Sequence, residues 1–178
     1  PQADQEPRQA GFAGRAVADH VRKAGYGRAG TVTANDERAH RRRDAFTTRF
    51  VHLGGRSVLA HDCAGPASIA SGRASLADLI DNRKLDGGVI FCSSDVLAQG
   101  VMIEAQARNL SIPVDLGVIG FGDQEFAAHL EPPLTTVRVD RDRLGQQAAD
   151  TILERLNGGE RPRIVVDLGF NIITRQSD

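Results

Sequence analysis

The sequence predicts an α/β fold in which helices flank a largely parallel sheet, and two observations lead to this prediction. Segments with helical hydrophobic periodicity alternate with short turns and β-branched runs along the chain. The apolar run over residues 116–121 is uninterrupted, as expected for a strand that is buried on both faces. The length of 178 residues allows one domain or a pair of small lobes.

Helices and strands alternate most clearly in the first half of the chain. We expect a helix over residues 13–24, because Val17 and Val21 lie one turn apart and Gly25 can end the helix in a left-handed conformation. The elements expected after it are a strand over 29–34, an arginine-rich helix over 37–51, a helix over 75–81 and a strand over 89–92. Together these segments form consecutive βα-type units.

The second half of the chain continues the same alternation. A helix is expected over residues 95–109, with Leu97, Val101 and Ala105 on one stripe, followed by the strand over 116–121. After a break at two prolines, the expected elements are an extended segment over 134–139, an amphipathic helix over 141–156 and β-rich pieces over 163–166 and 168–173.

The composition argues against several classes of protein. The formal net charge is -1, so no overall field draws the chain to nucleic acid or to an anionic membrane. The apolar runs are far shorter than the roughly 18 residues of a membrane span. The first seven residues carry acids and prolines instead of a signal peptide's basic and apolar stretches, which favours the cytoplasm. Cys63 and Cys92 are widely separated, so we expect reduced thiols instead of a disulfide or a metal site.

Residues 25–30 match the dinucleotide pattern G-x-G-x-x-G, but the match follows a helix and precedes a strand. Pyrophosphate binding needs the reverse order, so we expect an ordinary turn and infer no cofactor. The nucleophile pattern G-x-S-x-G, the P-loop and H-E-x-x-H are all absent from the sequence. Its histidines lack ligand spacing: His20, His40, His52, His61 and His129. The sequence therefore indicates neither an enzyme nor a metal protein.

Polar side chains follow two of the expected strands. The cluster of Arg38, Arg41, Arg42 and Arg43 is typical of a solvated helix face. It also lies just after a strand, where parallel sheets place ligand-binding groups, so one of its members can bind a carboxylate or vicinal hydroxyls. Residues 93–95, Ser-Ser-Asp, stand between a strand and a helix. They can cap the helix or contact a ligand, and these two interpretations are compatible.

Three segments carry a family resemblance in the right order. In residues 86–100 a strand ends in a small polar residue plus aspartate and enters a helix; residues 112–123 and 132–137 follow at the right distances. Together they resemble the LacI/GalR family of bacterial transcription regulators. The motifs over 122–125 and 137–141 look most like the gluconate-repressor branch, and the resemblance covers residues 11–176.

This resemblance implies a periplasmic-binding-protein-like type I fold, in which two α/β lobes joined by chain crossings bind a small effector in a cleft. On that template residues 1–136 form a nearly complete C-terminal lobe, 137–163 a returning piece of the N-terminal lobe, and 164–178 the final crossing with a C-terminal-lobe strand. The rest of the N-terminal lobe and the helix-turn-helix head have no counterpart in the chain. Operator DNA would be bound through that head, by a homodimer, and no membrane partner is implied.

The resemblance also assigns effector contacts. Arg42 corresponds to the family's arginine before a Gly-Phe pair, which is Ala45-Phe46 here, and the family's Asn-Asp is Ser94-Asp95. Gly122 replaces the first aspartate of Gly-Tyr-Asp-Asp, and Asp123 keeps the second. Because an acidic group beside Arg42 would repel a carboxylate, its loss suits a sugar acid such as gluconate. Near the lobe crossing, further positive charge could come from Arg138 and Arg141.

The leading alternative is a periplasmic sugar-binding protein for transport, which shares the fold; an enzyme on the same scaffold comes third. A regulator needs no catalytic step, only an effector that prefers one arrangement of the lobes. For this chain alone we expect weak or no effector binding, because half of the cleft is missing. The apolar stripe that includes Leu144, Ile152 and Leu156 predicts dimerisation or aggregation.

Overall fold

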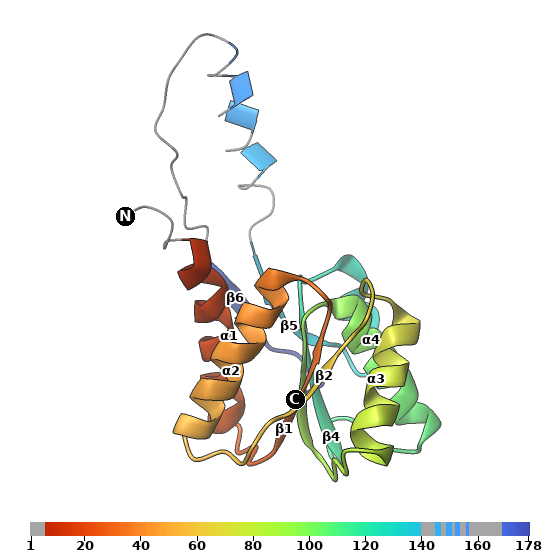
Figure 1. Cartoon of the computed structure of the whole chain (residues 1–178). Coiled ribbons are helices and arrows are strands. Elements are labelled where there is room, and N and C mark those ends of the chain that lie inside the picture. Colours follow the sequence, from red (N-terminus) through yellow and green to blue (C-terminus); the bar gives the residue numbers. More distant parts are fainter. Residues whose placement is uncertain (1–5, 140–144, 147–148, 151, 154–155, 157–168) are drawn as a thin grey trace.

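A six-stranded sheet runs through the molecule, with helices on both of its faces (Figure 1). The structure is a computed structural model that describes residues 6–139, 145–146, 149–150, 152–153, 156 and 169–178. The strands are β1 (Ala29–Thr33), β2 (Leu59–Asp62), β3 (Gly88–Cys92), β4 (Leu116–Phe121), β5 (Thr135–Arg138) and β6 (Asn171–Ile173). Their order across the sheet is β2-β1-β3-β4-β5-β6. Strands β1 to β5 pair in parallel and β6 pairs antiparallel with β5, so the expected α/β class with a mostly parallel sheet is confirmed.

The helices form two pairs. On one face α1 (Glu6–Lys23) packs with α2 (Glu37–His52), and on the other α3 (Ile69–Asp81) packs with α4 (Asp95–Ala107) (Figure 1). A short 3-10 helix, η1 (Glu125–His129), follows β4. Successive side chains of β3 point to opposite faces of the sheet, so they contribute to two hydrophobic cores, one on each face. Ile90 joins the cluster under α3 and α4, whereas Phe91 joins the cluster under α1 and α2, where its ring packs against that of Phe46 at a tilt of 43°.

Glycines allow the paired helices to approach closely. A Cβ built at Gly14 of α1 would lie 2.1 Å from the carbonyl oxygen of Arg42 in α2. At the other crossing, a Cβ at Gly100 of α4 would lie 2.2 Å from the carbonyl oxygen of Ile69 in α3. Both distances are far inside van der Waals contact, so a larger residue would separate the helices.

Most expected elements agree with the structure to within one or two residues, but the starts of two helices were wrong and one strand was missed. The first helix begins at Glu6 instead of residue 13, and Pro7 in its first turn is compatible with this earlier start. Helix α3 begins at Ile69 instead of residue 75, because the hydroxyl of Ser68 caps it by accepting a hydrogen bond from the Ser71 amide at 3.0 Å. Strand β2 was not anticipated.

The segment expected to return through a second lobe lies largely outside the described residues. Where the structure describes residues 145–156, they are helical, in agreement with the expected helix over 141–156. The expected strand over 163–166 falls outside the described part of the chain. The last β-rich piece is confirmed as β6, although it is shorter than residues 168–173.

Candidate functional site

The carboxyl ends of β1, β3, β4 and β5 meet along one edge of the sheet, because these strands are parallel. We call this edge, with the residues that directly follow each strand, the carboxyl edge. It brings together residues that lie far apart in sequence. Of the residues expected to bind an effector, Ser94, Asp95, Asp123 and Arg138 lie in these strand-end segments, and Arg42 reaches the edge from α2. Arg141 lies outside the described residues.

Arg42 packs under this edge with an incomplete set of hydrogen bonds. Its guanidinium carbon lies 4.0 Å from the centre of the Phe121 ring, and its Nη2 donates a long hydrogen bond of 3.5 Å to the carbonyl oxygen of Ser93. Its Nε is buried and has no hydrogen-bond partner among the described residues. Burial lowers the pKa of Arg42, Asp36 opposes this shift and Arg38 adds to it. An arginine nevertheless stays protonated, so a cation is held here with donor capacity to spare.

The other arginines of α2 behave as a solvated helix face. Arg41 pairs with Glu37 one turn away, and Arg43 pairs with Asp44 and with Asp62 at the end of β2. The helix starts at the N-cap Asp36, whose Oδ1 accepts a hydrogen bond from the Ala39 amide at 2.8 Å. Within the cluster, Arg41 and Arg43 therefore form surface ion pairs, whereas Arg42 turns inward.

The two serines after β3 have local structural partners. The Ser93 hydroxyl accepts a hydrogen bond of 2.9 Å from the Ala34 amide and so joins the ends of β3 and β1. Ser94 is the N-cap of α4, and its hydroxyl accepts from the Leu97 amide at 3.3 Å. Both side chains remain partly exposed. A capping hydroxyl keeps its own proton to donate, so the cap leaves ligand contact open.

Asp95 is fully buried behind the edge. Its Oδ1 accepts a hydrogen bond of 2.5 Å from the Thr136 hydroxyl, and its Oδ2 accepts one of 2.6 Å from the Gln124 amide. Burial raises the pKa of Asp95, and these two hydrogen bonds partly oppose the rise. The carboxylate thereby fastens the loop after β4 to strand β5.

Asp123 is the centre of an ion-pair cluster. Its side chain is 7% exposed, its Oδ1 accepts from Arg175 Nη2 at 2.7 Å, and its Oδ2 accepts from Arg138 Nε. Burial by itself would raise the pKa of Asp123, but the hydrogen bonds from the two arginines outweigh it and hold the pKa below its ordinary value. The residue has a φ of +47°, a conformation that aspartate tolerates better than most residues.

Arg175, which follows β6, was missed by the sequence analysis. Besides Asp123 it reaches the carbonyl oxygen of Leu134 at 2.6 Å, and its own amide donates to the Thr135 hydroxyl at 2.8 Å. A single arginine in the last β-rich piece offers no periodic or spacing signal. Only the antiparallel return of β6 beside β5 brings it to the carboxyl edge.

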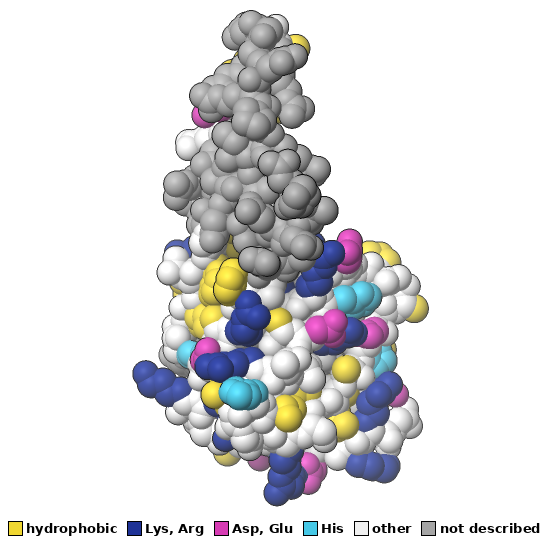
Figure 2. Space-filling view, turned by 60° about the vertical axis from the view of Figure 1, so that its left-hand side comes forward, with side chains coloured by type: hydrophobic (Ala, Val, Ile, Leu, Met, Phe, Trp, Pro, Cys, Tyr) yellow, Lys and Arg dark blue, Asp and Glu magenta, His cyan; other side chains and the backbone are white. Residues whose placement is uncertain are grey.

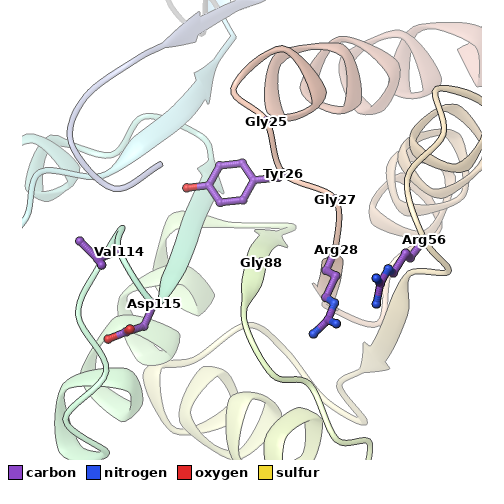
Figure 3. A pocket seen from close by; sticks show the side chains of 8 residues that line it. All are labelled: Gly25, Tyr26, Gly27, Arg28, Arg56, Gly88, Val114 and Asp115. Atoms are coloured by element: carbon purple, nitrogen blue, oxygen red, sulfur yellow. The ribbon is translucent and has the colours of Figure 1, made fainter.

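A separate pocket of about 380 Å³ opens at the opposite end of the sheet (Figure 3). Its lining includes residues 25–28 of the glycine-rich segment, between the end of α1 and the start of β1. Gly25 has a φ of +100°, as expected for a glycine that ends a helix. This arrangement confirms the expected helix-to-strand turn, and Arg28 within it pairs with Asp86.

Neither a membrane-spanning helix nor a metal-binding cluster is found among the described residues. None of the helices among them is both long enough and apolar enough to span a membrane. Within the same residues, no group of three or more histidine, cysteine, aspartate or glutamate side chains is arranged to hold a metal ion. Cys63 and Cys92 are both buried and free, as expected.

Comparisons with known proteins agree with this architecture. A family model described as a periplasmic binding protein-like domain matches residues 18–177. The HTH-type transcriptional regulator GntR of Pseudomonas aeruginosa is 31% identical over 170 residues, which cover 93% of this chain and 48% of that protein. The chain therefore spans about half the length of this curated relative.

Solved structures show the same likeness. The transcription regulator GntR from Chromobacterium violaceum is similar with a TM-score of 0.85 and 31% identity, covering 95% of this chain and 63% of that one. A LacI family transcriptional regulator from Mycobacterium smegmatis is similar with a TM-score of 0.81 and 26% identity, covering 95% and 63%. The chain belongs to the periplasmic binding protein-like domain family, in the form that serves LacI/GalR-type regulators as their effector-binding region.

Proposed function

We propose that this chain is the ligand-sensing part of a LacI/GalR-type bacterial transcription regulator and that it binds a small sugar acid, such as gluconate, at the carboxyl edge. The observation that carries the proposal is Arg42, a cation with a buried Nε that has no partner among the described residues. A carboxylate is the natural complement, because the arginine fork can bind it with two parallel hydrogen bonds.

The surrounding charges favour an anion over a neutral sugar. Gly122, which stands where the family has an aspartate, has a φ of +129° that side chains rarely adopt. The carboxylates that remain already have partners: Asp36 caps α2, Asp95 accepts from two hydrogen-bond donors, and Asp123 pairs with two arginines. Positive charge at this edge is therefore not fully balanced. Ser94 and Arg138 are the other residues that we propose to contact the effector, while the two aspartates position the loop.

In this proposal the sheet and its flanking helices belong to the C-terminal lobe, proposed for residues 1–136 and 164–178 and extended by β5 to Arg138. The chain beyond β5, to about residue 163, returns through a second lobe that completes the cleft. The effector would favour one arrangement of the lobes in a cytoplasmic homodimer, and a separate head would bind operator DNA. In Figure 2 basic, acidic and histidine side chains are interspersed over the face shown, without one large basic patch. This distribution suits a domain that leaves DNA contact to another part of the protein.

The same fold would serve a periplasmic sugar-binding protein, but the similar proteins named above are transcription regulators. We therefore propose sensing without catalysis. Recovering the sequence that precedes Pro1 in the gene separates the two functions, since a helix-turn-helix supports the regulator and a signal peptide the transporter component.

The ligand is tested by calorimetric titration of the complete two-lobe protein with gluconate and with glucose. Arg42→Gln is expected to weaken gluconate binding about 10- to 100-fold, as for the loss of a charge-assisted hydrogen bond. Arg41→Gln is the matched control, because Arg41 pairs on the surface with Glu37. Equal gluconate affinity in the Arg42 variant and the wild type would remove Arg42 from the site. For the present chain alone, micromolar affinity would contradict the need for a second lobe.

A further inference from the structure

The two arginines that share Asp123 hold it with unequal strength. Arg175 is largely buried, and it is fixed by three hydrogen bonds to Asp123, Leu134 and Thr135. The side chain of Arg138 is 54% exposed and, among the described residues, its ion pair is with Asp123, from its Nε to Asp123 Oδ2. Water and salt reach the exposed guanidinium of Arg138 and weaken its ion pair with the buried Asp123, whereas the buried and multiply bonded Arg175 is retained. An incoming anion can therefore displace the contact of Arg138 but not that of Arg175.

Arg138 also occupies a special place along the chain. It is the last residue of β5, and the chain continues from it into the segment proposed to enter the second lobe. Asp123 belongs to the loop after β4, two residues beyond Phe121, whose ring Arg42 covers at 4.0 Å. The ion pair between Asp123 and Arg138 thus links the proposed effector site to the start of a chain crossing.

Resting on the proposed function, we propose that Arg138 is a switch residue that exchanges the carboxylate of Asp123 for the carboxylate of the effector. One carboxylate can accept hydrogen bonds from two arginines, as Asp123 does from Arg138 and Arg175, so the effector can bind Arg42 and Arg138 together. Asp123 then stays bound to Arg175, and its amide stays near the Thr136 hydroxyl, 3.3 Å away, so the β4 loop keeps its place. Arg138 is then released from the β4 loop and pairs with the effector carboxylate, and the end of β5 moves together with Arg138. The exchange replaces one ion pair with another, so the free-energy cost of the exchange is small. Effector binding can therefore shift the position of the chain where it leaves β5 toward the second lobe.

The exchange predicts effects of opposite sign for the two partners. Asp123→Asn removes the competing charge while keeping an oxygen for Arg175, and asparagine tolerates the positive φ of this position. Gluconate should then bind the complete two-lobe protein about two- to fivefold more tightly, as for the release of one exposed ion pair. Arg138→Gln should weaken binding by a similar or larger factor. In the double variant the benefit of Asp123→Asn should vanish, because there is no arginine left to release.

A purely structural role for the cluster gives a different pattern, since Asp123→Asn would then weaken gluconate binding by loosening the loop. That result would overturn the exchange while leaving the sensing proposal intact, provided that the wild type binds gluconate and Arg42→Gln binds it more weakly. Absence of gluconate binding by the wild type would overturn both. Asp78→Asn is the matched control, as Asp78 is also paired with an exposed arginine, Arg83, but on α3. Thermal unfolding checks that each variant is folded. If the Asp123 variant unfolds, unchanged gluconate binding in Arg138→Gln, an exposed change, would still overturn the exchange.

Discussion

Asp95 shows how one buried carboxylate can organise the carboxyl edge of the sheet without being open to solvent. It is fully buried, and both of its oxygens accept short hydrogen bonds, from the Gln124 amide and the Thr136 hydroxyl. Each bond crosses from α4 to a different element. Replacing Asp95 with alanine removes both, and we expect this to lower the free energy of unfolding by about 2–4 kcal/mol.

The Asp95→Asn variant separates the charge of this side chain from its hydrogen bonds. Burial raises the pKa of Asp95, so the protonated form favours folding. Its stabilising contribution is complete below the ordinary pKa of 3.8 and is lost as pH rises through the raised value of the folded state. The stability of Asp95→Asn relative to the wild type should therefore improve from pH 4 to pH 7.5 in urea unfolding. A relative stability that falls over this range would contradict a raised pKa.

At the scale of elements, the position of Arg42 depends on how α2 packs against α1. Gly14 sits at this crossing, and a Cβ there would lie 2.1 Å from the carbonyl oxygen of Arg42 itself. Gly14→Ala should therefore push α2 outward, lowering the free energy of unfolding by about 1–3 kcal/mol. It should also weaken gluconate binding in the two-lobe protein, although residue 14 touches no ligand.

The control for this change is Gly27→Ala, because a Cβ at Gly27 meets nothing within 4 Å. Both variants are compared by chemical denaturation and by calorimetric titration with gluconate. Equal unfolding free energies for the two variants would show that the helix pair can relax around a methyl group at the crossing. Arg42 would then be less dependent on the packing of α1 than the geometry indicates.

At the scale of the whole molecule, apolar side chains lie exposed on the described part of residues 145–156. Ile152 is 59% exposed and Leu156 is 77% exposed, whereas a packed amphipathic helix would bury this face. We expect the isolated chain to self-associate through them, which sedimentation velocity over a range of micromolar concentrations can measure. The double variant Ile152→Ser/Leu156→Ser should shift the chain toward the monomer.

Val114→Ser is the matched control for self-association. Val114 is 85% exposed but lines the pocket at the opposite end of the sheet. It should leave the sedimentation coefficient unchanged. If this control, and not the double variant, reduced association, the contact between chains would involve the opposite end of the sheet instead.

The sequence alone determined the α/β class and most element positions, because hydrophobic period and capping residues act over a few neighbouring residues. It did not indicate β2, whose residues 59–62 are only partly buried at an edge of the sheet and include the polar pair His61-Asp62. Arg42 could be selected from its cluster through a family motif, whereas the paired state of Asp123 could not.

Only the tertiary structure decided which charges remain open at the carboxyl edge. Asp123 and Arg175 are separated by 52 positions, and the antiparallel return of β6 sets the distance between them. Periodicity records which face of a helix or strand is buried, but an ion pair depends on where distant segments end in space. The elements of the fold could therefore be inferred from patterns among neighbouring residues. The charge balance of the proposed site could not, because it depends on contacts between distant segments.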